Sequence, residues 1–429
     1  MKHLVFFAWA FPPHVSGGVF RHLPLVRYGK QQGLEISVIA SSLSQKPTQA
    51  GQDLLDTVPK DTPIARITKG SFKKKEKFPL FSVMFLSFLS NPQLLLLLVR
   101  TLLCKPPRID GNVSELLKIK DYCYSNFKSN PPDIVMASGP PFHTFIAACF
   151  VAAHYKAKLV LDYCDEWTEC PFDFVQPGKM DLLWEKECLK RADRVIFVTK
   201  SVRDKYLKLF PMLDSRKCYI VPNGWEPEDF QLNSNERDSK IPNNSSLILS
   251  FVGTLSYALP AQFLATLERV LQDKPELIKK LKLRFIGNKS PQALTELSSF
   301  AYPEIIENIP LLPKQQANQS MQESTGLLLL NPPELACYLP GKLYDYLATS
   351  SPIIVYGEGG DPANLVRELK AGFIVPEGDH NCLAQALEEL LNNHNKPQDF
   401  EAVQKRNIWL KNHTREALVS KTVEMLNSM

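Results

Sequence analysis

A lysine at the start of a predicted helix is the first residue that suggests chemistry. Lys342 follows Pro340-Gly341, which would begin the helix, so its ammonium falls in the first turn. Cations are favoured at the C-terminal end of a helix, and a nearby anion such as a diphosphate would explain this reversed placement. Asp345 lies three residues further on the same helical face, where its carboxylate could bind ribose hydroxyls. A solvated Lys–Asp pair is the alternative.

A second possible anion site follows the first predicted strand. Gly17-Gly18 begin a predicted helix, and glycine allows a ligand to approach the backbone and its free N–H groups. Arg21, one turn further, could add a charge-assisted hydrogen bond. A tight turn without a ligand is the alternative. The segment lacks the G-x-G-x-x-G pattern, which counts against a nicotinamide or flavin enzyme.

Acid–base chemistry is suggested by polar residues that follow other predicted strands. His143 falls in the first turn of a helix and could act as a general acid or base facing a cleft; a surface histidine is the alternative. Asp162 and Asp165 could bind hydroxyls or act as a base, although at least one of them could simply cap a helix. Asn223 stands in an Asn-Gly turn that we expect at the floor of the cleft, on the acceptor side.

We expect neither a metal nor another cofactor. The strand-end carboxylates have no histidine or cysteine partners at suitable spacing. The nine cysteines include no Cys-x-x-Cys pair, so they predict neither a zinc site nor a disulfide framework. The short apolar run at residues 4–10 is typical of a buried strand rather than a signal peptide, and we expect a cytoplasmic protein.

Apolar strands alternate with helical patterns along almost the whole chain, which predicts parallel βαβ units buried on both faces. The predicted strands are 4–9, 35–40, 133–137, 159–161, 194–198, 218–221, 247–252, 281–286, 326–330, 352–355 and 373–375. The predicted helices include 18–32, 141–154, 180–191, 260–271, 342–348 and 382–391.

The length of 429 residues suggests two domains. A polar stretch at 232–246 is typical of a linker between an N-terminal domain, 1–231, and a C-terminal domain, 247–396. Residues 397–429 look helical. The predicted fold is α/β, with two doubly wound Rossmann-like domains facing a central cleft, and ligands in such sheets bind beyond the carboxyl ends of the strands. In the second domain, Gly253-Thr254 and Gly287-Asn288-Lys289 are strand-end turns whose N–H groups could lie near a nucleotide.

These segments, in this order, resemble the retaining family 4 glycosyltransferases of the GT-B fold, and a bacterial surface-polysaccharide branch in particular. The motifs that carry the resemblance are Pro-Pro followed by Gly-Gly-x-x-Arg, residues 162–167, Ala-Asp-Arg-Val-Ile-Phe-Val-Thr at 192–199, Val-Pro-Asn-Gly at 221–224, residues 341–354 and Thr-Arg-Glu-Ala at 414–417. The last motif resembles a helix that returns to the N-terminal domain.

The resemblance implies transfer of a sugar, with retention, from a nucleotide-diphosphate donor, often a UDP-sugar, without a catalytic metal. It places Gly18 near the diphosphate, His143 near the transferred sugar, Lys342 at the phosphates and Asp345 at the ribose. The same donor-site segments contain Glu334 and Leu343.

Two positions depart from the family pattern. Many members have two glutamates separated by seven residues, whereas this chain has Cys337 in the first place and Asp345 in the second, with Glu334 off that spacing. Many also have basic residues after the first strand of the second domain, where this chain has residues 256–259 without one. Lys289 is a possible substitute.

A membrane-associating segment is predicted at residues 73–108, from Lys73 to Arg108. Its apolar run is interrupted by Asn91-Pro92, which predicts two helices too short to span a bilayer. Residues 60–108 hold 10 basic and 2 acidic residues, a net of +8, whereas the whole chain has +5. This concentration favours an anionic membrane surface over nucleic acid as a partner. A buried helical pair covering the first domain is the alternative.

The leading hypothesis is a glycosyltransferase that acts at the cytoplasmic membrane face on a lipid-linked or polysaccharide acceptor. One alternative is a nucleotide-sugar epimerase of the same fold, which the membrane-like segment disfavours because such an enzyme has a soluble substrate. Another is an inactive scaffold that binds a sugar nucleotide, which the replaced glutamate and the missing basic loop allow.

Overall fold

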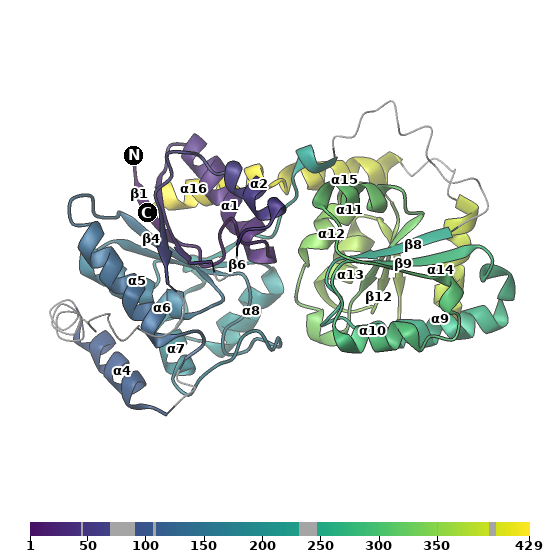
Figure 1. The fold of residues 1–429 in the computed structure, drawn as a ribbon, viewed down its shortest axis with the longest axis horizontal. Helices are drawn as coiled ribbons and strands as arrows, with labels where there is room; N and C mark the ends of the chain where they lie inside the picture. The colour runs from purple at the N-terminus through teal and green to yellow at the C-terminus, as the bar shows by residue number, and fades with distance from the viewer. Residues whose placement is uncertain (44–45, 69–90, 106–108, 231–246, 350, 394–399) are drawn as a thin grey trace. The chain divides into compact units, whose positions relative to one another are not determined.

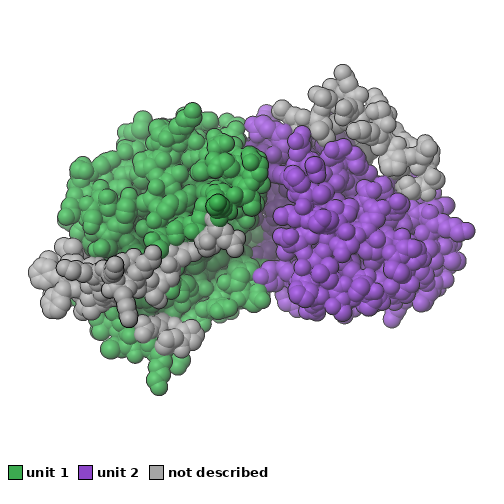
Figure 2. Space-filling view, in the orientation of Figure 1, with its two compact units in different colours: residues 1–222, 416–429 green, residues 223–415 purple. Residues whose placement is uncertain are grey.

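The structure is a computed structural model that describes residues 1–429 except 44–45, 69–90, 106–108, 231–246, 350 and 394–399. The chain forms two compact units, Met1–Pro222 with Glu416–Met429, and Asn223–Arg415, which Figure 2 shows in different colours. The predicted linker at 232–246 lies outside the described residues. So do residues 73–90 and 106–108 of the predicted membrane segment.

The division differs from the predicted boundaries at two places. The first unit ends at Pro222 rather than at residue 231. Of the C-terminal stretch 397–429, helix α15 (Phe400–Asn412) belongs to the second unit, whereas nearly all of α16 (Arg415–Asn427) belongs to the first. The Lys2 ammonium donates to the carbonyls of Leu426 at 3.1 Å and Asn427 at 2.9 Å, and so ties the end of α16 to the start of the chain.

The first unit is built on a parallel sheet with the order β3-β2-β1-β4-β5-β6-β7 (Figure 1). Its strands are β1 (His3–Phe7), β2 (Glu35–Ser41), β3 (Ile64–Ile67), β4 (Ile134–Gly139), β5 (Lys158–Tyr163), β6 (Arg194–Phe197) and β7 (Cys218–Ile220). Its helices are α1 (Gly17–Gln31), α2 (Gln49–Asp56), α4 (Pro92–Leu103), α5 (Val113–Asn126), α6 (His143–Tyr155), α7 (Asp181–Arg191) and α8 (Lys200–Leu209), followed by α16.

The strands of this sheet consist largely of apolar residues, as expected for a parallel sheet that helices cover on both faces. One core cluster joins side chains of α1 and α16 to those of β1, β2 and β4, so these two helices lie on the same face. The winding of the sheet changes direction between β1 and β4, whose residues pair in parallel from Leu4–Ile134 to Phe7–Ala137. Such a switch point is where ligands bind in open α/β sheets.

The second unit repeats this arrangement with the strand order β10-β9-β8-β11-β12-β13, and its winding reverses between β8 and β11. Its strands are β8 (Leu247–Val252), β9 (Leu281–Ile286), β10 (Ile306–Ile309), β11 (Gly326–Leu330), β12 (Ile353–Tyr356) and β13 (Gly372–Val375). Its helices are α9 (Ala261–Asp273), α10 (Pro291–Ser298), α11 (Lys314–Gln322), α12 (Gly341–Thr349), α13 (Gly360–Glu368), α14 (His380–Asn393) and α15. The predicted fold class of two doubly wound, parallel-sheet units is therefore confirmed.

Two strands were absent from the predicted set, and both lie at the outer end of a sheet. β3 reads Ile-Ala-Arg-Ile and β10 reads Ile-Glu-Asn-Ile, so each has polar residues inside it. An outer strand has a neighbour on only one side and is only partly buried, so it need not form a continuous apolar run. None of the described helices combines the length and the apolar character that crossing a bilayer requires.

Candidate active site

Two predicted ligand-binding residues of the first unit bind each other. Arg21, in the first turns of α1, donates to Asp162 at the end of β5, with Nη2–Oδ1 at 2.5 Å and Nε–Oδ2 at 2.9 Å. The Ser138 hydroxyl donates to the same carboxylate at 2.8 Å. Burial alone would raise the pKa of Asp162, but the Arg21 guanidinium and the Ser138 hydroxyl outweigh it and keep this pKa below its ordinary value. Each charge of this pair is neutralised by the other within the unit. The pair therefore holds the start of α1 against the end of β5 and is not available to bind a ligand.

Asp165 differs from Asp162 although it lies only three residues away. Its carboxylate accepts no hydrogen bond within the described part of the chain, and it is partly exposed. Burial raises its pKa to about 6, against the opposing charge of Arg21. A carboxylate that titrates near neutral pH and has an open side can accept a proton from a substrate hydroxyl.

His143 is fully buried, which corrects the expectation that it faces a cleft. Helix α6 begins at His143 and is apolar on all sides, so the sheet and neighbouring helices cover every face of its first turns. The ring stands edge-on to Trp9 with centroids 4.7 Å apart, and its Nε2 lies 3.6 Å from a Glu115 carboxylate oxygen. Neither ring nitrogen has a hydrogen-bond partner among the described residues. Burial lowers the pKa to about 3, so His143 is neutral and cannot act as a general acid at neutral pH.

Gly17 and Gly18 begin α1, as predicted for a backbone site. The residue before them, Ser16, is extended, and its side chain does not cap the helix. A Cβ at Gly17 would meet nothing within 4 Å, and one at Gly18 would lie 3.5 Å from His22 and 3.7 Å from Ala10. The helix start is therefore open on the side where a side chain would project, and a ligand can approach its N–H groups.

The second unit brings two glycine turns into contact at the ends of β8 and β9. Gly253 and Gly287 have φ angles of +132° and +124°, which side chains rarely adopt. The Gly253 N–H donates to the Ile286 carbonyl at 2.8 Å, and a Cβ at Gly287 would lie only 2.4 Å from the Gly253 oxygen. The two turns pack backbone against backbone, so both positions require glycine.

Lys342 lies against this pair of turns. It is in the first turn of α12, and its ammonium is 3.8 Å from the centre of the Phe251 ring. A Cβ at Gly253 would be 3.3 Å from its Nζ. No carboxylate among the described residues pairs with it, and burial lowers its pKa to about 7. A desolvated ammonium that has no carboxylate partner among the described residues would be stabilised by a bound anion.

Asp345 completes this part of α12. Burial raises its pKa to about 6, although Lys314 and Arg415 oppose that shift. Its Oδ1 is buried and has no hydrogen-bond partner among the described residues. An acceptor atom left in this state can bind a hydroxyl of a ligand.

The remaining predicted residues of the second unit have more ordinary surroundings. The Lys289 ammonium donates to the carbonyls of Gly287, at 2.9 Å, and Ile309, so it does not replace the missing basic loop as a free cation. Leu343 is a fully buried core residue. Thr254, Asn288 and Glu334 are exposed. Asn223 is half-buried, and its Nδ2 lies 3.5 Å from the Leu339 carbonyl oxygen.

Several residues that were not predicted from the sequence hold these groups in place. The Tyr346 hydroxyl accepts from the Val252 N–H at 2.8 Å and fixes α12 to the end of β8. Phe251 forms the floor under Lys342, and Ser138 holds Asp162. Only Tyr346 had a signal in the sequence, because it lies four residues after Lys342 and thus on the same side of the helix.

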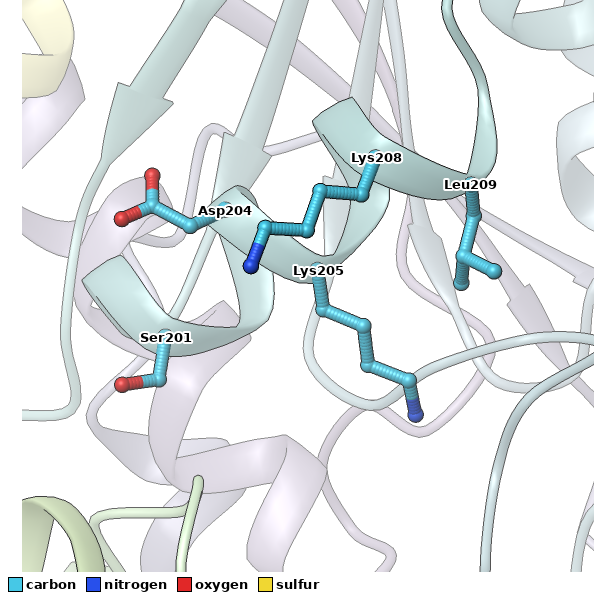
Figure 3. A pocket seen from close by; sticks show the side chains of 5 residues that line it. All are labelled: Ser201, Asp204, Lys205, Lys208 and Leu209. Atoms are coloured by element: carbon cyan, nitrogen blue, oxygen red, sulfur yellow. The ribbon is translucent and has the colours of Figure 1, made fainter.

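Within the described part of the chain, neither a metal site nor the surface hollow on α8 contributes a residue to the candidate active site. Among the described residues, no three histidine, cysteine or acidic side chains converge as metal ligands. A hollow of about 420 Å³ is lined by Ser201, Asp204, Lys205, Lys208 and Leu209, all from α8 (Figure 3). None of these is a predicted site residue, and Lys205 is paired with Glu166 at 2.7 Å.

Replacing Arg21 by methionine should destabilise the protein by about 3–5 kcal/mol in urea unfolding at pH 7, because Asp162 would stay buried without its partner. R21M/D162N should recover most of that loss. The pKa of Asp162 is lowered in the folded state, so its stabilisation is present above about pH 4 and is lost as the pH falls through the folded pKa. Arg216→Met, which breaks an exposed pair with Asp214, is the control and should change little. Equal stability of R21M and wild type would contradict the assignment.

Gly287→Ala should cost about 1–3 kcal/mol of stability, because the new methyl group meets the Gly253 carbonyl and φ is positive. Gly341→Ala is the control, since a Cβ there meets nothing within 4 Å. Thermal unfolding of both variants measures the difference. Similar melting temperatures for both would show that the two turns are not in backbone contact.

Sequence profiles of known families cover most of the chain. Residues 16–229 match the profile described as Glycosyltransferase Family 4, and residues 246–393 match that of Glycosyl transferases group 1. No curated protein sequence matched the chain.

Solved structures share the fold over the full length at low identity. Sucrose-phosphate synthase from Thermosynechococcus elongatus is 12% identical, with a TM-score of 0.67 and coverage of 100% of this chain and 99% of that one. HepE from Anabaena, solved with UDP-glucose, is 12% identical, with a TM-score of 0.66 and 100% coverage of both chains. A glycosyltransferase from Rickettsia africae is 13% identical, with a TM-score of 0.65 and coverage of 99% and 97%. Together with the profile matches, these likenesses show that the chain is a glycosyltransferase of the GT-B fold and belongs to glycosyltransferase family 4.

Proposed function

We propose that this enzyme transfers a sugar, with retention, from a UDP-sugar to a lipid-linked or polysaccharide acceptor at the cytoplasmic face of a membrane. The observation that carries the donor part is the Lys342 ammonium, which is desolvated, lies on the Phe251 ring and pairs with no carboxylate among the described residues. A diphosphate would supply the missing negative charge. The Anabaena relative solved with UDP-glucose supports the choice of donor.

Each side chain then has a defined task in the proposed reaction. As the bond between the sugar and the diphosphate breaks, negative charge grows on the leaving phosphate, and Lys342 stabilises that charge. The unpartnered Oδ1 of Asp345 accepts a hydrogen bond from a ribose hydroxyl. Asp165 orients the acceptor hydroxyl and accepts its proton, since its carboxylate has no partner among the described residues. We propose no catalytic metal.

The acceptor class rests on different support. The lipopolysaccharide outer core galactosyltransferase WaaB has the same fold, with 12% identity and a TM-score of 0.61. The predicted basic and apolar segment 73–108 would suit a lipid-linked acceptor, and α4 is its principal described element. A peripheral position on the inner membrane face belongs to this proposal.

Lys342→Met should weaken UDP binding roughly 10- to 100-fold in calorimetry, as expected for a lost hydrogen bond to a charged group. Uridine binding should be unchanged, because it lacks the phosphates. Lys279→Met, which removes an exposed lysine of the same unit, is the control. Loss of uridine and UDP binding in equal measure would show a folding defect, and unchanged UDP binding would refute the phosphate contact.

The same contact predicts a pH dependence of UDP binding. The pKa of free Lys342 is about 7, and a bound diphosphate raises it, so UDP binding takes up a proton above pH 7 and weakens as the pH rises. Calorimetry in buffers of different ionisation enthalpy measures this proton uptake. It should disappear in Lys342→Met.

Asp165→Asn should lower the rate of UDP release in the presence of a membrane lipid extract by about 10²- to 10⁴-fold, the usual contribution of a positioned base. UDP-sugars should be tested as a panel. The wild-type rate should rise with pH around the Asp165 pKa of about 6, and this step should be absent in the variant. Glu169→Gln, an exposed carboxylate of the same loop, is the control. A full rate in Asp165→Asn would remove it from the reaction.

A further inference from the structure

Several of the exposed large apolar side chains of the first unit come from neighbouring segments. Leu103 at the end of α4 is 81% exposed, Phe174 is 46%, and Leu182 and Leu183 at the start of α7 are 47% and 45%. We call these four residues, with Lys105, Lys179 and Lys186, the α4–α7 rim. Exposed leucines and phenylalanines gathered in one place indicate an interaction surface rather than ordinary scatter.

Hydrogen bonds show that these segments lie side by side. The Trp184 indole N–H donates to the Thr101 hydroxyl at 2.8 Å, so the start of α7 contacts the end of α4. Figure 1 shows these two helices in the same part of the first unit. At the other end of the pair, the Arg191 guanidinium donates to Asn91 Oδ1 at 3.0 Å, which makes the two helices antiparallel. Leu103 and Leu183 therefore lie close to the Thr101–Trp184 contact.

Buried carboxylates hold the loop before α7 in place. Asp181 accepts from the Asp110 N–H at 2.6 Å and the Gly178 N–H at 2.5 Å, and Asp110 accepts from the Gln176 N–H at 3.1 Å. The Phe172 and Phe174 rings are stacked, with centroids 5.2 Å apart. Phe174 is thus presented from an anchored loop, so little conformational freedom would be lost when it is buried against a partner.

The exposed charged side chains on and beside the rim are mostly basic. Residues 173–191 hold four basic and four acidic residues, a net of zero. Asp181 and Glu185 are buried, however, Glu187 binds Arg191 at 2.5 Å, and Asp173 is the one acidic residue of this range that is exposed. Lys179, Lys186 and Lys190 are exposed and pair with no carboxylate in the described part of the chain, and Lys105 on the neighbouring segment is also exposed.

We infer that the α4–α7 rim is a docking surface for an anionic lipid bilayer, in which leucine and phenylalanine side chains enter the interface and the lysines contact phosphate headgroups. Charge complementarity supports this occupant, because apolar side chains surrounded by unpaired lysines fit the boundary between acyl chains and anionic headgroups. The inference rests on the proposed function for its membrane-bound acceptor. It adds residues 174–186 to the membrane-associating segment predicted from the sequence, of which α4 is the principal described element.

Co-sedimentation of the full-length protein with vesicles tests this surface. Wild type should bind vesicles of phosphatidylcholine and phosphatidylglycerol and bind those of phosphatidylcholine alone at least tenfold more weakly. K179Q/K186Q should weaken binding to the anionic vesicles roughly 25-fold, about fivefold for each lysine. K279Q/K280Q, an exposed pair in the second unit, should match wild type. Equal binding of wild type to both vesicle types would overturn the proposal.

The apolar part needs its own variants. L182S/L183S should reduce vesicle binding at least tenfold, whereas Leu294→Ser, 43% exposed on α10, should not. Leu183→Trp should show a blue-shifted emission on anionic vesicles that brominated lipids quench, and Leu294→Trp should not. An unquenched Leu183→Trp, or full vesicle binding by L182S/L183S, would refute lipid contact. So would a wild-type dimer in ultracentrifugation that L182S/L183S abolishes while vesicle binding persists, since the rim would then join two copies.

UDP calorimetry separates this inference from the proposed function. The rim variants should bind UDP as wild type does, because none of them replaces a donor-binding residue. Failure of wild type to bind UDP would reject the donor proposal and leave the vesicle result standing. Loss of UDP binding in L182S/L183S together with a lowered melting temperature would instead assign the rim leucines to folding and overturn the docking surface.

Discussion

Parallel strands present all their carboxyl ends at one edge of a sheet, and this constraint determines where both units can hold ligands. Each sheet reverses its winding once, between β1 and β4 in the first unit and between β8 and β11 in the second. At these edges the chain leaves a strand and starts a helix, so glycine turns and helix N-termini accumulate there. In the first unit, Gly17 begins α1 in the segment after β1, and in the second unit Gly253 forms a turn with positive φ directly after β8.

At these edges, whether a charged side chain is paired distinguishes the residues that stabilise the fold from those that can bind or act on a ligand. Arg21 and Asp162 satisfy each other, so their charges are fully used in holding α1 against β5. Lys342 and Asp345 are half-buried as residues. Among the described residues, however, no carboxylate pairs with the Lys342 ammonium, which lies on the Phe251 ring, and the buried Oδ1 of Asp345 has no hydrogen-bond partner. An uncompensated buried charge lowers stability, and a ligand that compensates it gains the corresponding binding energy. The unpaired groups are therefore the better candidates for catalysis.

The sequence predicted the central strands well, because buried strands read as continuous apolar runs, and the outer strands β3 and β10 poorly, because polar residues interrupt them. It placed Lys342 in the first turn of α12 because Pro340-Gly341 begin that helix, and the helix dipole then suggested an anion beside it. It could not show that Arg21 and Asp162, 141 residues apart, would pair, or that the first turn of α6 would be covered and His143 removed from solvent. Those outcomes depend on packing between distant segments, which local patterns do not contain.

The α4–α7 rim shows why net charge along a sequence can misrepresent a surface. Over residues 173–191 the basic and acidic residues are equal in number, so counting suggests a neutral segment. Folding removes Asp181 and Glu185 from the surface, where Asp181 anchors the loop before α7 and Glu185 binds the Tyr206 hydroxyl at 2.9 Å. The lysines remain outside because burying an unpaired ammonium costs far more than burying a hydrogen-bonded carboxylate. The same acids that stabilise the loop therefore leave a basic face around the exposed leucines.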